Sequence, residues 1–129
     1  MRIVQDGIVY KTHNEALAAA LDIHRTIKHQ EATYVLPGKW MVWFPNMAHQ
    51  GGDWVNHYRD GGDIIEQQYM GAGEERDMML DYTRITFAKE GGGYVFKGIY
   101  GEGRRIDTRT VRFRKLANAC EVVFRGSFV

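Results

Sequence analysis

Residues 94–117, YVFKGIYGEGRRIDTRTVRFRKLA, contain three glycines and seven cationic residues among aromatic and apolar ones. The second half of this stretch alternates apolar and cationic side chains, as a strand does when only one of its faces is buried. We expect Val111 and Phe113 to point inward. Arg112 and Arg114 then share the outer face, where a guanidinium can meet solvent or an anionic partner.

The first half of the stretch, residues 94–100, is an aromatic strand interrupted by a glycine. Tyr94, Phe96 and Tyr100 are separated by even numbers of positions, so a regular strand places them on one face. Gly98 leaves a gap among these rings. A glycine inside a strand often marks a bulge, a bend or the close approach of another group.

The rest of the chain supplies further strands and one helix. Thr12 and Glu15 match a capping box, and the apolar residues that follow at helical spacing predict a helix over residues 13–30. Segments rich in β-branched and aromatic residues predict the strands: ATYVL, KWMVWFP, DIIEQQYM, DYTRITFAK, YVFKGIY, TRTVRFRKL and CEVVFRGSFV. The sequence therefore predicts an α+β fold in one domain, residues 1–129, with a small, strongly curved or closed, mainly antiparallel β-sheet or barrel packed by the N-terminal helix.

Three connections are also predicted. Asp6–Gly7 in RIVQDGIVY favours a short hairpin, because this pair tolerates the positive φ angles of a tight turn. Residues 45–62 contain four glycines and show no sustained period, which indicates a long loop with one helical turn. Residues 101–107 are expected to form a second loop.

Charge is distributed unevenly although the net charge is only +1. Residues 1–83 hold 7 Lys/Arg against 12 Asp/Glu, whereas residues 84–129 hold 10 against 4. Such asymmetry indicates contact with nucleic acid or a membrane surface, or a solvated face that pairs with the acidic half. No apolar run approaches the roughly 20 residues of a membrane span, no signal-peptide pattern is present, and the single cysteine, Cys120, fits the core of a protein in a reducing compartment. We expect a cytoplasmic protein without a membrane partner.

The sequence carries no pattern of a common catalytic class. His49, Asp53 and His57 are spaced four apart, but Gly51–Gly52 would interrupt the helix needed to bring them together, at about 1 kcal/mol per glycine. The only serine is Ser127, and no phosphate-cradling glycine loop occurs. We therefore predict no catalytic residues, no metal site and no cofactor.

Large aromatic residues are numerous for so short a chain. They either close one end of a barrel or form a cage in which rings stack on a planar base. In the second case the predicted base or ligand pocket consists of Trp40, Trp43, Asp53, Trp54, Asn56, Tyr58, Tyr94 and Tyr100. The predicted phosphate-binding residues are Arg104, Arg105, Arg109, Arg112, Arg114 and Lys115. We expect the guanidinium groups and the indole rings to converge on the concave side of one curved sheet.

The pattern Tyr94-x-Phe-x-Gly-x-Tyr100, followed by Val111-x-Phe-Arg-Lys-Leu116, resembles part of the small β-barrel domains of the PUA-like group, of the SRA and EVE type. Some members of this group are attached to restriction endonucleases that recognise modified DNA. The resemblance covers residues 94–116 and implies a curved sheet that holds a flipped-out base between aromatic rings.

Together these observations predict a nucleic-acid-binding module without catalysis of its own, which recognises a modified or flipped base through an aromatic pocket. Two alternatives stay open: a β-barrel that binds or acts on a small apolar or aromatic ligand, and a protein–protein interaction domain. The sequence does not distinguish DNA from RNA and leaves the oligomeric state unknown.

Overall fold

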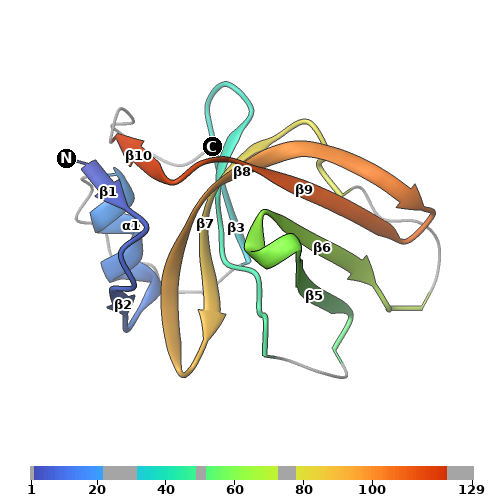
Figure 1. Cartoon of the computed structure of the whole chain (residues 1–129), viewed down its shortest axis with the longest axis horizontal. Coiled ribbons are helices and arrows are strands. Elements are labelled where there is room, and N and C mark those ends of the chain that lie inside the picture. Colours follow the sequence, from blue (N-terminus) through green and yellow to red (C-terminus); the bar gives the residue numbers. More distant parts are fainter. Residues whose placement is uncertain (1, 22–31, 49–51, 73–77, 122–129) are drawn as a thin grey trace.

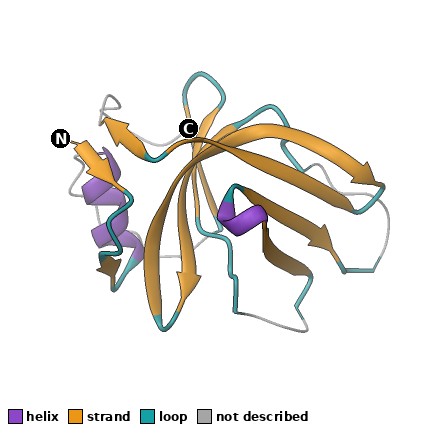
Figure 2. Cartoon of the chain, in the orientation of Figure 1, coloured by secondary structure: helices purple, strands orange, loops and turns teal. Residues whose placement is uncertain are grey.

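The computed structural model describes residues 2–21, 32–48, 52–72 and 78–121. Strands dominate this part of the chain (Figure 2), and the α-helix α1 and a short 3₁₀ helix accompany them. In chain order the elements are β1 (Arg2–Val4), β2 (Val9–Tyr10), α1 (His13–Leu21), β3 (Thr33–Leu36), β4 (Trp40–Trp43), β5 (Trp54–Arg59), the short 3₁₀ helix η1 (Asp60–Gly62), β6 (Ile64–Tyr69), β7 (Thr83–Glu90), β8 (Gly93–Asp107), β9 (Thr110–Ala117) and β10 (Ala119–Glu121).

Seven of these strands form one curved sheet in the order β3-β4-β7-β8-β9-β6-β5, and β2 pairs with the start of β8 (Figure 1). Neighbouring strands are antiparallel except β4 and β7, which run parallel. The sheet stays open within the described residues, because β3 and β5 do not pair with each other. The predicted α+β class with a strongly curved, mainly antiparallel sheet is confirmed, in its open form rather than as a closed barrel.

The helix begins where the capping box predicts. The Glu15 backbone N–H donates to Thr12 Oγ1 at 3.1 Å, and Glu15 Oε2 accepts from the Lys11 N–H at 2.9 Å. Helix α1 lies at one end of the molecule beside β1 and β2 (Figure 1), and its buried Leu17 and Leu21 pack into the same apolar cluster as Cys120. Residues 22–30, the rest of the predicted helix, lie outside the described residues.

Strand β8 bends at Gly98, as a glycine in mid-strand suggests. Thr86 of β7 pairs with Gly98 while the next residue, Phe87, pairs with Phe96, so one extra residue of β8 lies between them. This bulge shifts the alternation of side chains by one position. Phe96 therefore packs in the cluster beside α1, whereas Tyr100 packs in a second cluster inside the curve of the sheet. The expectation that Tyr94, Phe96 and Tyr100 share one face is wrong for this reason.

The predicted loop at residues 45–62 contains a strand. Strand β5 occupies Trp54–Arg59 and pairs along its whole length with β6, and η1 forms the turn between them. Polar residues within β5 obscure the strand in the sequence, because Asn56 is buried by the fold instead of facing solvent. The predicted loop at 101–107 is likewise strand, since β8 continues to Asp107 with irregular register.

The N-terminal segment does not form a hairpin. Asp6 Oδ1 accepts from the Ile8 N–H at 2.9 Å, which turns the chain there, but β1 pairs with β10 and β2 pairs with β8. Both short strands thus gain partners from the C-terminal half. No helix among the described residues is long and apolar enough to cross a membrane.

Candidate ligand-binding site

A cavity of about 400 Å³, partly open to solvent, lies inside the curve of the sheet. Its walls come from strands that stand far apart in the sheet order, and curvature brings them together. Asn56 of β5 shows this directly, since its Nδ2 donates at 3.3 Å to the backbone carbonyl of Asn46, which follows β4. The cavity is lined by residues 32–33, 43–46, 52–54, 78 and 79 together with Asn56, Gln67 and Arg84.

Four of the eight predicted pocket residues line this cavity: Trp43, Asp53, Trp54 and Asn56. Trp43 is only 1% exposed and forms part of the second apolar cluster. Trp54 is half-buried and its ring lies 4.9 Å from that of Tyr69, whereas Asp53 is exposed. The cavity thus has aromatic walls, with a carboxylate in an exposed position.

The other four predicted pocket residues lie elsewhere. Trp40 and Tyr94 pack with the cluster beside α1. Tyr100 is fully buried in the second cluster, and its hydroxyl donates to the Gly62 carbonyl. Tyr58 lines a neighbouring cavity of about 390 Å³, and Asn56 lines both cavities.

Asn56 holds an unused hydrogen-bond acceptor. The residue is 3% exposed, and its Oδ1 has no hydrogen-bond partner within the described part of the chain. An unpaired buried polar group costs about 1–3 kcal/mol of stability. A ligand in the cavity that donates a hydrogen bond to Oδ1 would remove this cost.

Arg84 is the residue of this site that sequence reasoning missed. It lies on β7 and is 2% exposed. Its Nη2 donates to the carbonyls of Met78 at 2.8 Å and Met79 at 3.1 Å, while Nη1 lies 2.7 Å from Met41 Sδ. Burial lowers the pKa of Arg84 to about 9. In the sequence, Arg84 alternates with apolar Ile85 in the manner of a solvent-facing residue, so its burial left no signal.

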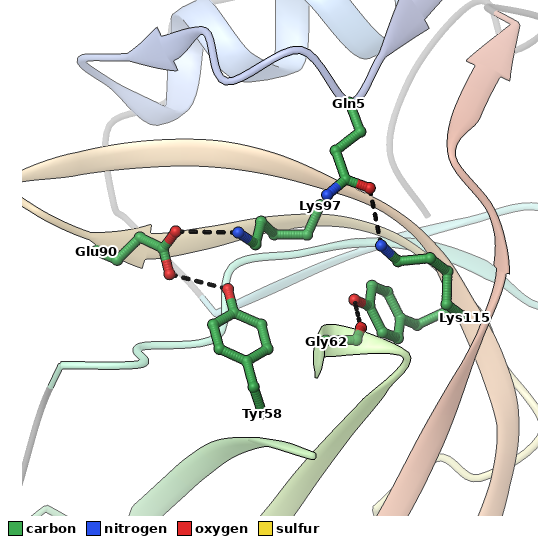
Figure 3. Close-up of polar contacts among 7 residues, drawn as sticks. Gln5, Tyr58, Gly62, Glu90, Lys97 and Lys115 are labelled. Carbon is green, nitrogen blue, oxygen red and sulfur yellow. Dashed lines mark hydrogen bonds and ion pairs between the residues drawn. The ribbon is translucent and has the colours of Figure 1, made fainter. Parts of the chain in front are cut away.

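A polar network lies beside the neighbouring cavity (Figure 3). Tyr58 Oη donates to Glu90 Oε2 at 2.9 Å, and Lys97 Nζ pairs with Glu90 Oε1 at 3.2 Å. Burial and the contact with Glu90 raise the pKa of Tyr58, so Tyr58 is an uncharged donor at neutral pH. In the same view, Lys115 donates to the Gln5 side chain at 2.8 Å, and burial lowers the pKa of Lys115.

Arg112 and Arg114 of β9 lie on the face of the sheet opposite the second cluster. Val111 and Phe113 are fully buried in the second cluster, as predicted. Arg112 Nε pairs with Glu66 at 3.0 Å, and Arg114 pairs with Glu102. The expected convergence of guanidiniums and indoles on one concave side is thus wrong for these two arginines, because strand alternation sends them to the face opposite Phe113.

Cations near the tip of the β8–β9 hairpin lie differently. Arg104 and Arg105 are exposed. Arg109 Nη1 donates to the Gly71 carbonyl at 2.8 Å, and its guanidinium lies 5.6 Å from the centre of the Tyr69 ring, which in turn contacts Trp54. Arg109 is thus connected to the cavity wall through Tyr69. Among the described residues no group of three or more His, Cys, Asp or Glu could hold a metal ion, and His49 of the possible metal triad lies outside them.

No protein-family model and no curated protein sequence matches this chain. Its fold is similar to part of AbaSI, a 5-hydroxymethylcytosine-specific restriction enzyme, with a TM-score of 0.69 and 17% sequence identity. The alignment covers 97% of this chain and 44% of that chain, so the chain spans less than half the length of the enzyme. The chain therefore has the fold of one portion of a restriction enzyme that is specific for a modified base.

Proposed function

We propose that this chain is a nucleic-acid-binding module whose cavity receives a modified or unpaired base flipped out of the stack. The resemblance of residues 94–116 to PUA-like domains and the fold likeness to AbaSI support this function. Flipping is the route by which proteins reach base atoms hidden in a duplex. No catalytic role is assigned to the chain.

The observation that carries the proposal is the buried, unpaired Oδ1 of Asn56, a residue that lines the cavity together with Trp43 and Trp54. Ligand pockets typically measure about 300–1,000 Å³, so a single base fits the available space. Stacking of a base on an aromatic ring contributes about 1–3 kcal/mol. An exocyclic amine or ring N–H of the base would donate to Asn56 Oδ1.

The phosphates next to the flipped base would be held by cations at the hairpin tip. Arg109 is connected to Trp54 through Tyr69, and Arg104 and Arg105 are exposed on the same hairpin. Such contacts position a protein on nucleic acid without reading its sequence. Arg112 and Arg114 would join them only by leaving Glu66 and Glu102.

Binding is tested by fluorescence anisotropy of labelled duplexes that differ at one base: cytosine, 5-methylcytosine or 5-hydroxymethylcytosine. We expect tighter binding to one modified duplex, and log Kd that changes with log salt by about 0.9 for each phosphate contacted. Trp54→Ala should weaken binding about tenfold or more, since stacking energy is lost. Trp40→Phe is the control, because Trp40 packs outside the cavity.

Equal affinity for all three duplexes would contradict recognition of a modified base. A salt-independent Kd would contradict binding to the phosphate backbone. Equal losses in Trp54→Ala and Trp40→Phe would place the binding site away from the cavity.

A second candidate is a free aromatic ligand, which the apolar side chains of Met78 and Met79 in the wall would also accommodate. Any ligand that binds only the native state raises its stability. Free nucleosides that raise the Tm when oligonucleotides do not would favour this alternative.

A further inference from the structure

Arg84 is a buried cation without an acidic partner among the described residues. Its hydrogen bonds within this part of the chain go to neutral groups, namely two carbonyls and a thioether sulfur. Its Nε–H is buried and has no partner there. The guanidinium carbon lies 3.9 Å from the Phe113 ring centre and 4.8 Å from that of Trp43, so aromatic faces take the place of a counter-ion.

This arrangement stabilises the positive charge only in part. Cation–π contacts contribute about 0.5–2 kcal/mol each, whereas a buried charge normally requires pairing with an opposite charge. Among the described residues of the cavity wall, the only other charged side chain is Asp53, which is exposed and therefore surrounded by solvent. The inner wall of the cavity, as far as the structure describes it, thus carries an uncompensated positive charge.

We propose that the cavity prefers a planar heteroaromatic ring that carries a carboxylate, such as 5-carboxylcytosine, over the same ring with a neutral substituent. This inference rests on the proposed function for its setting, a base presented by nucleic acid. A carboxylate supplies both missing components at Arg84, an acceptor for a guanidinium N–H and a negative charge. The ring itself still stacks on the half-buried Trp54, and its amine still donates to Asn56 Oδ1.

The decisive comparison uses two ligands of equal shape. Duplexes containing one 5-carboxylcytosine or the corresponding carboxamide are titrated against the wild-type chain, with 5-hydroxymethylcytosine and cytosine duplexes alongside. Both ligands can accept a hydrogen bond from the Arg84 guanidinium, but only the carboxylate adds the attraction of an opposite charge, so we expect it to bind about tenfold or more tightly than the carboxamide. Equal affinities for these two ligands would overturn the inference without any variant being made.

Two variants test the role of Arg84 itself. Arg84→Met should reduce the carboxylate-to-carboxamide ratio to about one, whereas Arg84→Lys retains the charge and part of the preference. A purely structural Arg84 would lower the Tm of Arg84→Met and leave the ratio unchanged, which would also overturn the inference. If either variant fails to fold, the wild-type ligand pair decides.

Free 5-carboxylcytidine separates this inference from the proposed function. If the free nucleoside binds and no duplex does, the inferred preference for a carboxylate is supported and the proposed nucleic-acid function fails. If the hydroxymethyl duplex binds and the carboxylate has no advantage, the function stands and the inference fails. Absence of binding by every probe refutes both.

Discussion

Replacement of Gly98 by alanine tests whether the bulge in β8 shapes the sheet. Gly98 has a φ of +118°, a conformation that L-residues rarely adopt, and a Cβ built on it would lie 2.5 Å from the Ala117 carbonyl oxygen. The obstructing atom belongs to the backbone of the neighbouring strand β9, so it cannot move aside as a flexible side chain would.

The size of the effect follows from two terms. Holding a residue in a sparsely populated backbone conformation costs about 1–3 kcal/mol, and forcing an extra methyl group into a packed site costs about a further 1–3 kcal/mol. We therefore expect Gly98→Ala to reduce the free energy of unfolding by about 3 kcal/mol or more. For a domain of this size that corresponds to a fall in Tm of roughly 10 °C.

Gly91→Ala is the matched control. Gly91 also has a positive φ, +60°, but no atom of the described residues lies within 4 Å of the position that an alanine Cβ would take there. Alanine in this left-handed conformation costs about 1–2 kcal/mol. Guanidinium unfolding followed by tryptophan fluorescence measures both variants. A loss in Gly98→Ala no larger than that in Gly91→Ala would refute the steric part of this reasoning.

Two further predictions concern pH and charge. His13 is stacked on Phe44, and burial followed by the nearby charge of Lys89 lowers the pKa of His13 from 6.5 to about 4. Between these two pH values His13 is protonated in the unfolded chain but not in the native state. The free energy of unfolding should therefore fall by roughly 3 kcal/mol as pH drops from about 6.5 to about 4. Urea unfolding at both pH values should show this loss, while His13→Gln, unlike His57→Gln at an exposed position, should reduce it. Glu66→Gln should cost about 1–2 kcal/mol at pH 7, because it weakens the pairs of Glu66 with Arg59 and Arg112. Burial alone would raise the pKa of Glu66, but the hydrogen bonds and charges of these arginines outweigh it and lower the pKa. The stability from these pairs is therefore lost as pH falls through the lowered pKa. If stability decreases with acid in the same way in Glu66→Gln as in the wild type, Glu66 does not contribute as argued.

Local patterns in the sequence predict the elements that depend on local chemistry. The capping box at Thr12 and Glu15 marks the start of α1, and the alternation of Val111 and Phe113 with arginines gives the inner face of β9. Local patterns do not predict strand β5, because its Asn56 is polar and yet buried. The buried Asn56 amide is explained by its hydrogen bond to the carbonyl of Asn46, which the curvature of the sheet brings within reach.

The bulge explains why the aromatic residues of β8 could not be assigned to a site from their spacing. One extra residue before Gly98 sends Phe96 and Tyr100 into different clusters. Even spacing predicts a shared face only while the register of a strand is regular. The sequence identifies the glycine that breaks this register, but the direction of the side chains after it depends on the pairing with β7.

Two residues that line the cavity each carry a buried polar group without a partner among the described residues. Within the described residues, Asn56 Oδ1 is an acceptor without a donor, and Arg84 Nε–H is a donor without an acceptor. Both residues line the same cavity, although they lie on β5 and β7 and are not neighbours in the sheet order. Apolar side chains at both positions would avoid the cost of burying polar groups. The fold therefore keeps a donor and an acceptor on residues of one cavity at a cost in stability, and under the proposed function a ligand that offers the complementary pair would remove that cost.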